Sequence, residues 1–175
     1  MTNIEMLENT LPIAPLKLIA MESCKPLGQK VNDYIVSFRE NTINEVTESP
    51  LYRNYKANNY QVDCSCPRFG SGEAKGVLKE TIRGTDLFIM TDVCNYSLTY
   101  TVNGHLNHMS PDDHYQDLKR IIAAATGKAR RINVIMPFLY ESRQHKRTAR
   151  ESLDCALALQ ELVKMGVDNI ITFDA

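Results

Sequence analysis

Four basic side chains lie close together in one short stretch of the sequence, just after an apolar run that contains a proline. The guanidinium group offers a planar fork of donors that matches the oxygens of a phosphate. A phosphate-binding loop is one interpretation and a solvated basic loop is the other, and the residue types alone leave both open. The four residues are Arg143, Lys146, Arg147 and Arg150.

A single aspartate, Asp174, ends the last apolar run of the chain. A carboxylate there can bind Mg²⁺ or a ribose hydroxyl, since Mg²⁺ in phosphate chemistry is usually held by one or two carboxylates together with the substrate. It can also cap a following helix. Taken from the residues alone, the helix cap is the simpler interpretation.

Three histidines, His105, His108 and His114, lie near the pair Asp112–Asp113 and raise the question of a metal site. His105 and His108 precede the start of a predicted helix, and two aspartates in a first turn suit the positive end of the helix dipole. A helix start is therefore the preferred interpretation.

The cysteines predict free or buried thiols. Cys64 and Cys66 form a C-x-C pair, but a closed zinc site needs four ligands and the sequence has no second cysteine pair. An odd, scattered set also argues against a disulfide framework. The full set is Cys24, Cys64, Cys66, Cys94 and Cys155.

Four short apolar runs must position these groups. Continuous runs rich in Ile, Val, Leu, Phe and Met are typical of strands that are covered on both faces, as in a parallel sheet. Ligands of such sheets bind at the carboxyl ends of the strands. The runs are 16–21, 86–92, 132–138 and 169–174.

Helical patterns separate the runs, at 26–39, 111–125 and 151–165. Ser110 is a good N-cap for the second helix, and Thr148 stands three residues before Glu151 with the spacing of a capping box for the third. Alternation of strand and helix predicts right-handed crossovers and an α/β fold, with a parallel sheet flanked by helices. Residues 41–59 predict an irregular insertion, and 60–82 a β-hairpin at the sheet edge.

The bulk composition limits the function classes. The chain has 175 residues, 43% of them hydrophobic, which fits one domain, and 20 basic against 21 acidic side chains, which gives no argument for a nucleic-acid or anionic-membrane partner. No apolar run reaches the roughly 20 residues that span a bilayer, and the first residues lack a secretory signal, so we expect a cytoplasmic location. G-x-x-x-x-G-K-[ST], G-x-G-x-x-G and H-E-x-x-H are all missing.

Four segments, in order, resemble the N-terminal half of the ribose-phosphate pyrophosphokinases. Residues 23–30 (SCKPLGQK) are similar to the family's first loop and helix start. Residues 69–84 resemble its Phe-Ser-Asp-Gly-Glu loop and Glu-Ser-Ile/Val-Arg-Gly, with the same spacing between the two glutamates. Residues 132–147 (INVIMPFLYESRQHKR) match a strand, a proline and Arg-Gln, and residues 166–174 match the strand that leads to Asp-x-His.

The resemblance implies two α/β domains of the type I phosphoribosyltransferase fold, of which this chain, 1–175, is the first. It implies transfer of the diphosphoryl group of ATP to the 1-hydroxyl of ribose 5-phosphate with Mg²⁺, in a homo-oligomer. The family's Arg-Gln contacts ATP, its Phe-x-Asp-x-Glu loop closes on the adenine from a neighbouring subunit, and its Asp-x-His ligates metal. The matching nucleotide-site residues are Phe69, Ser71, Glu73, Arg143 and Gln144, and the matching metal ligand is Asp174.

The chain also departs from the family pattern. Ser71 stands where Asp or Asn is usual, His145 replaces an Asp, and Glu141 replaces an aromatic residue. Residues 41–59 and 94–114 are longer than in common members. The sequence stops one residue before the expected His, so we expect a fragment of a longer enzyme that is inactive by itself.

Two other functions remain. Relatives of the family that lose catalytic residues act as regulatory or assembly modules, but retention of the matched site residues favours an active parent. A stand-alone phosphoribosyltransferase is disfavoured, because no Asp-Asp followed by a Gly/Thr-rich turn comes after a strand; Asp112–Asp113 begins a helix instead.

Overall fold

The computed structural model describes residues 12–42 and 55–175. Its centre is a four-stranded parallel sheet in the order β1-β4-β7-β8. The predicted parallel sheet is confirmed, and each strand ends before its apolar run does, because the run continues into the loop that leaves the sheet. The strands are β1 (Leu16–Ala20), β4 (Asp86–Met90), β7 (Arg131–Ile135) and β8 (Asn169–Ile171).

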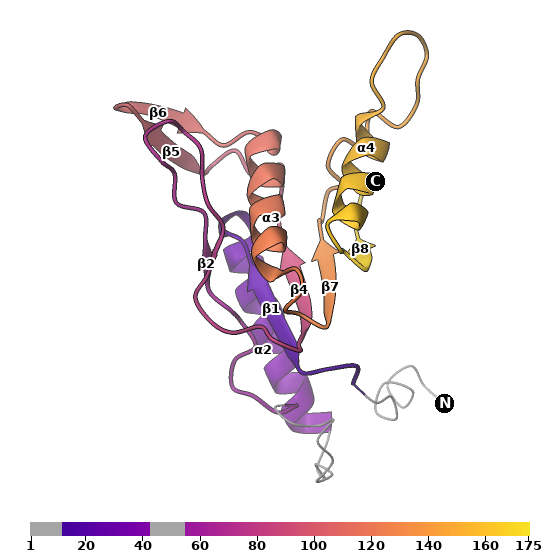
Figure 1. Cartoon of the computed structure of the whole chain (residues 1–175). Helices are drawn as coiled ribbons and strands as arrows, with labels where there is room; N and C mark the ends of the chain where they lie inside the picture. The colour runs from indigo at the N-terminus through magenta and orange to yellow at the C-terminus, as the bar shows by residue number, and fades with distance from the viewer. Residues whose placement is uncertain (1–11, 43–54) are drawn as a thin grey trace.

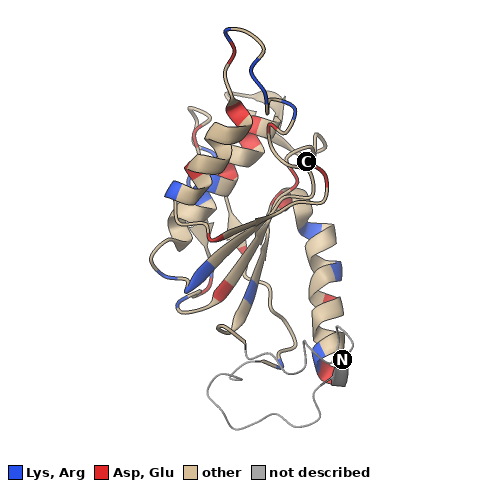
Figure 2. Cartoon of the chain, turned by 90° about the vertical axis from the view of Figure 1, so that its right-hand side faces the viewer, with Lys and Arg blue, Asp and Glu red and all other residues tan. Residues whose placement is uncertain are grey.

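Helices cover both faces of the sheet (Figure 2). After the short 3-10 helix η1 (Glu22–Cys24), α2 (Lys25–Thr42) covers one face, while α3 (Pro111–Ala125) and α4 (Asp154–Lys164) cover the other. The larger apolar core lies on the side of α3 and α4, and a smaller cluster around Leu18 lies under α2. The predicted α/β fold, a parallel sheet flanked by helices, is therefore confirmed.

The predicted N-cap of α3 forms a full capping box. The Asp113 N–H donates to Ser110 Oγ at 3.1 Å, and the Ser110 N–H donates to Asp113 Oδ2 at 2.9 Å. These two bonds satisfy donors that a helix start leaves free. The two capping residues are three positions apart in the sequence, and the structure forms the cap that they predict.

The start predicted for the last helix, at Glu151, is wrong. Thr148 Oγ1 does donate to Glu151 Oε1 at 3.1 Å, but this pair closes a turn in the preceding loop. Leu153 has φ −122° and ψ 67°, outside the helical region, and α4 begins only at Asp154. The physical reason is a tertiary bond: the Gln144 side chain donates to the carbonyl of Ser152 at 2.8 Å and holds the loop extended.

The predicted edge hairpin is also present. β2 (Cys64–Ser65) pairs antiparallel with β3 (Val77–Leu78). The segment just before β2 runs beside β1. The Leu18 N–H donates to the Tyr60 carbonyl at 2.9 Å, and the Val62 N–H donates to the Leu18 carbonyl at 2.8 Å. Of the predicted insertion 41–59, residues 43–54 lie outside the described residues.

A second hairpin was not predicted. β5 (Thr99–Val102) pairs antiparallel with β6 (His105–His108) through a turn at Asn103 and Gly104, where φ is 50° and 80°. Asn-Gly is a strong hairpin signal, and β5 (TYTV) alternates in burial, but β6 (HLNH) is mostly polar and shows no matching alternation. In the described part of the chain, no helix is long and apolar enough to cross a bilayer.

Candidate functional site

The carboxyl ends of β7 and β8 are joined beyond the sheet. The Leu139 N–H donates to the Asp174 carbonyl at 2.9 Å, and the Asp174 N–H donates to the Pro137 carbonyl at 3.0 Å. Phe138 and Asp174 form an isolated parallel bridge. The backbone of Asp174 is thus fixed beside the loop that carries the basic residues, and its side chain is exposed.

That loop is a tight turn between Leu139 and Gln144. Ser142 donates to the Leu139 carbonyl at 3.2 Å, Gln144 donates to the Glu141 carbonyl at 2.9 Å, and Glu141 has a positive φ of 56°. The turn leaves Arg143 exposed at the carboxyl end of the sheet.

Arg143 also lies near the loop that follows β4. Burial and the Asp92 carboxylate raise the pKa of the Cys94 thiol, and the Arg143 guanidinium partly opposes them. The loops after β7 and β8 are hydrogen-bonded to each other through Leu139 and Asp174, and the charge of Arg143 acts on Cys94 in the loop after β4. These loops lie at the position at which open parallel sheets bind ligands.

Gln144 has a structural role that the sequence does not reveal. The side-chain Nε2 of Gln144 donates to the Ser152 carbonyl at 2.8 Å. The backbone carbonyl of Gln144 accepts from the Cys155 N–H at 3.4 Å. The side chain therefore braces the base of the basic loop. The other three basic residues of the loop are exposed, and Figure 2 shows this loop standing beyond the sheet. They are Lys146, Arg147 and Arg150.

The other predicted residues share a second turn. The Phe69 N–H donates to the Glu73 carbonyl at 2.7 Å, and the Gly72 N–H donates to the Phe69 carbonyl at 2.9 Å. Gly72 has φ 91°, a conformation that favours glycine. Ser71 Oγ donates to Glu73 Oε2 at 2.8 Å, and the Phe69 ring is 51% exposed. The turn presents an aromatic ring and a carboxylate to the surroundings.

Helix α3 separates this turn from Arg143. The β2–β3 hairpin packs on one side of α3, where Arg68 bonds Asp117 at 3.0 Å. Helix α4 packs on the other side, where Tyr115 Oη donates to the Ala158 carbonyl at 2.8 Å. Figure 1 shows the two regions to the left and right of α3. In one chain, the loop that carries Arg143 is bonded to Asp174 only through Leu139, and the Phe69–Glu73 turn lies on the other side of α3.

A groove of about 660 Å³ runs between α3 and α4 beside the basic loop. Its wall includes Tyr140, whose ring stacks on Tyr115 with centroids 4.2 Å apart and planes at 7°. Tyr140 Oη donates to Asp112 Oδ1 at 2.7 Å. Sequence reasoning missed this pair, because the partners come from distant segments and neither forms a motif.

The histidines and cysteines do not gather into a metal site in residues 12–42 and 55–175. His114 is buried and bonds the Asn95 carbonyl through Nε2 at 2.7 Å, while His105 and His108 are exposed on β6. Cys64 and Cys66 are free thiols, and burial raises their pKa to about 11 and about 12.

Comparison with known proteins identifies the family of the chain. Residues 16–166 match the family described as the N-terminal domain of ribose phosphate pyrophosphokinase. A ribose-phosphate pyrophosphokinase of Parasynechococcus marenigrum is 33% identical over 110 residues, which cover 62% of this chain and 29% of that protein. A putative ribose-phosphate pyrophosphokinase 2 of Lactococcus lactis is 28% identical over 160 residues, which cover 91% of this chain and 39% of that protein.

The crystal structure of phosphoribosylpyrophosphate synthetase from Mycobacterium smegmatis has a similar fold, with a TM-score of 0.64 and 21% identity, over 90% of this chain and 42% of that one. The chain therefore spans less than half the length of each of these relatives. With the family match covering most of its residues and the fold agreeing, the chain belongs to the ribose-phosphate pyrophosphokinase family, as the N-terminal domain.

Proposed function

We propose that this chain is the ATP-binding part of an enzyme that converts ATP and ribose 5-phosphate to AMP and phosphoribosyl pyrophosphate. The observation that carries the proposal is the bond between Leu139 and Asp174, which holds a carboxylate beside the Arg143 loop at the carboxyl end of the sheet. A cationic fork and a carboxylate after neighbouring strands at one edge of the sheet suit a nucleoside triphosphate bound with Mg²⁺.

The reaction makes one bond and breaks one. The 1-hydroxyl oxygen of ribose 5-phosphate attacks the β-phosphorus of ATP, the bond from that phosphorus to the oxygen bridging it to the α-phosphorus breaks, and AMP leaves with that oxygen. The hydroxyl proton passes to solvent. Such transfer depends on positioned charge more than on covalent chemistry. Arg143 would hold phosphate oxygens, and the brace from Gln144 to Ser152 would keep its loop in place.

Mg²⁺ fits the donor present. Asp174 supplies one exposed carboxylate on a fixed backbone, and Mg²⁺ at phosphate sites usually takes one or two carboxylates, with substrate oxygens and water completing its shell. Bound there, the ion would neutralise phosphate charge. Asp174 would orient the ion relative to Arg143.

The Phe69–Glu73 turn would serve a second copy of the protein. Because α3 keeps the turn away from Arg143 of the same chain, its exposed ring and carboxylate are free to face a nucleotide held by a neighbour. This supports a homo-oligomer, and a strict monomer in light scattering at high concentration would count against it. We also propose a cytoplasmic location for the enzyme.

The test is formation of AMP from ATP by the full-length protein that carries this sequence. We expect turnover that requires both ribose 5-phosphate and Mg²⁺, and that falls in Arg143→Ala. A protein without turnover that binds and alters an active relative would instead be a regulatory module. We expect the 175-residue chain alone to be inactive, because it spans 29% of one named enzyme and the resemblance places the ribose 5-phosphate loop in a second domain.

A further inference from the structure

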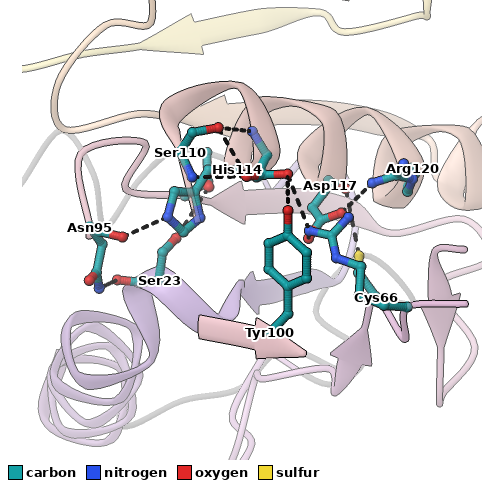
Figure 3. A network of polar contacts seen from close by, with 11 residues as sticks. Ser23, Cys66, Asn95, Tyr100, Ser110, His114, Asp117 and Arg120 are labelled. Carbon is teal, nitrogen blue, oxygen red and sulfur yellow. Dashed lines mark hydrogen bonds and ion pairs between the residues drawn. The ribbon is translucent and has the colours of Figure 1, made fainter. Parts of the chain in front are cut away.

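The base of the Phe69–Glu73 turn is anchored by a largely buried arginine. Arg68 precedes Phe69 and forms an antiparallel bridge with Ala74, so these two residues flank the turn. The Arg68 side chain is 11% exposed, and its Nη2 donates to Asp117 Oδ2 at 3.0 Å. Asp117, on α3, is 8% exposed and also accepts from Arg120. Figure 3 shows Asp117 at the centre of this network.

The unpredicted β5–β6 hairpin completes the anchor. The guanidinium carbon of Arg68 lies 4.7 Å from the centre of the Tyr100 ring, within the range of a cation–π contact. Tyr100 Oη donates to Asp113 Oδ1 at 3.5 Å, so the ring is in turn fixed to the start of α3. Figure 3 shows Tyr100 pointing from its strand toward α3.

The same hairpin also reaches the tip of the turn. A Cβ placed on Gly72 would lie 3.6 Å from Cγ2 of Val102, the last residue of β5. On the return arm, a Cβ on Gly76 would lie 2.4 Å from the carbonyl oxygen of Arg120, so that arm lies directly on the backbone of α3. The turn is therefore held at its base and along one side, while Phe69 and Glu73 remain exposed.

We propose that Arg68 is a positioning residue for nucleotide binding, and that the β5–β6 hairpin belongs to the nucleotide site because Tyr100 holds Arg68. This rests on the proposed function, in which the turn contacts the base of ATP. Arg68 does not touch the nucleotide. It orders the turn before binding, and a turn that is ordered in advance loses less conformational freedom on binding.

The first measurement is hydrogen exchange of the turn, which needs no substrate. The Phe69 and Gly72 amides are both hydrogen-bonded within it. In the full-length protein, Arg68→Lys keeps the charge but loses the planar fork, and Tyr100→Leu loses the ring. We expect each variant to speed exchange across 69–73 by about tenfold. Tyr100→Phe keeps the ring and loses only the 3.5 Å bond to Asp113, so its exchange should rise less than that of Tyr100→Leu.

The second measurement separates positioning from folding. We expect Arg68→Lys and Tyr100→Leu to raise the KM for ATP several-fold, with the KM for ribose 5-phosphate unchanged. Arg130→Lys, at an exposed arginine before β7, is the matched control and should change neither quantity. Equal melting temperatures of Arg68→Lys and the control would show that the fold is intact.

Each contrary result has a distinct meaning. Unchanged exchange in Arg68→Lys overturns the proposal whatever the protein's activity, because Arg68 then does not hold the turn. Faster exchange with an unchanged KM for ATP overturns it if Phe69→Ala does raise that KM, because an ordered turn is then not required. If Phe69→Ala has no effect, the turn is no nucleotide contact, and the positioning role fails together with that part of the proposed function.

Discussion

Asp86 and Arg131 face each other across β4 and β7 and form two hydrogen bonds, Nε to Oδ1 at 2.8 Å and Nη2 to Oδ2 at 2.5 Å. Asn133 Nδ2 donates to the same Asp86 Oδ1 at 2.8 Å, and Asn169 Nδ2 donates to Asn133 Oδ1 at 2.7 Å. This polar ladder joins three strands near their amino ends. Arg143 and Asp174 follow the carboxyl ends of the strands. The stabilising polar ladder and the proposed ligand site are therefore at opposite ends of the sheet.

The ladder predicts a large loss of stability in Asp86→Ala. The change leaves the Arg131 guanidinium without its acceptor and the buried Asn133 amide with only the Leu87 carbonyl at 3.1 Å. Breaking a buried pair costs about 3 kcal/mol when one partner keeps some solvent contact. Asp63→Ala is the matched control, since its pair with Lys79 spans 3.6 Å between side chains that are 73% and 57% exposed. That pair should contribute less than about 1 kcal/mol. Urea unfolding measures both, and equal midpoints would contradict the role of the ladder.

Two glycines of the β2–β3 hairpin predict opposite outcomes. In Gly76→Ala the new methyl group meets the Arg120 carbonyl, and forcing an atom into a packed contact costs about 1 to 3 kcal/mol. In Gly70→Ala the methyl group meets nothing within 4 Å, so stability should stay within about 0.5 kcal/mol of wild type. Thermal unfolding of the two variants gives the comparison. A Gly76→Ala protein as stable as Gly70→Ala would show that the hairpin does not lie against α3.

The sheet and its helices were predictable because their signals are local or continuous. A strand buried on both faces reads as an unbroken apolar run, as in 86–90, and Ser110 carries its own capping partner three residues later. The hairpin at 99–108 was missed because its second strand, HLNH, is mostly polar. The start of α4 was misplaced because the bond from Gln144 to Ser152 is a tertiary contact.

The family resemblance names candidate site residues but not their arrangement. The loop that carries Arg143 and the backbone of Asp174 are adjacent because β7 and β8 are neighbours, and strand order depends on long-range packing rather than on composition. The family motif covers the turn from Phe69 onward, but the support of that turn by Arg68 and Tyr100 joins three segments. No single stretch of sequence contains that contact.

The five cysteines predict a selective pattern of alkylation. The thiolate is the reactive form, so a raised pKa slows the reaction at a given pH. Burial raises the pKa of Cys24 and Cys66 to about 12 and that of Cys64 to about 11, whereas Cys94 is exposed and has a smaller upward shift. At pH 8, iodoacetamide should modify Cys94 first. Mass spectrometry of digests identifies the site, and Cys94→Ser should remove the rapid phase; rapid labelling of Cys64 or Cys66 would contradict the burial.

Asp174→Asn predicts loss of activity without loss of stability. The backbone of Asp174, not its carboxylate, makes the bonds to Leu139 and Pro137, so the fold should be unchanged. An amide binds Mg²⁺ less well than a carboxylate, and we expect the Mg²⁺ concentration for half-maximal AMP formation to rise by about tenfold or more. Asp168→Asn is not a suitable control, because Asp168 Oδ2 accepts from the Ile132 N–H at 2.8 Å. Asp63→Asn, at an exposed carboxylate, is suitable; an equal Mg²⁺ requirement in Asp174→Asn and Asp63→Asn would remove Asp174 from the metal site.

Arg143→Ala predicts weaker ATP binding together with a change at a neighbouring thiol. Loss of a charge-assisted phosphate contact should cost about 1.5 to 3 kcal/mol, which calorimetric titration of ATP into the full-length protein measures. The Arg143 charge also lowers the pKa of Cys94. Its removal should therefore raise that pKa, reduce the thiolate fraction and slow the alkylation of Cys94. Arg150→Ala removes an exposed charge from the far end of the same loop and should leave the Cys94 rate unchanged.

The two readouts separate the position of Arg143 from its role. If Arg143→Ala slows the Cys94 reaction but leaves the ATP affinity unchanged, Arg143 lies near Cys94 as in the structure. It then makes no contact with the phosphates of ATP. If Arg150→Ala weakens ATP binding as much as Arg143→Ala does, the loop attracts anions through its total charge. A bidentate contact would depend on the position of the arginine, whereas a screened electrostatic field would not. Repeating both titrations at higher salt decides between these, since the contribution of total charge should fall steeply while a direct Arg143 contact should persist.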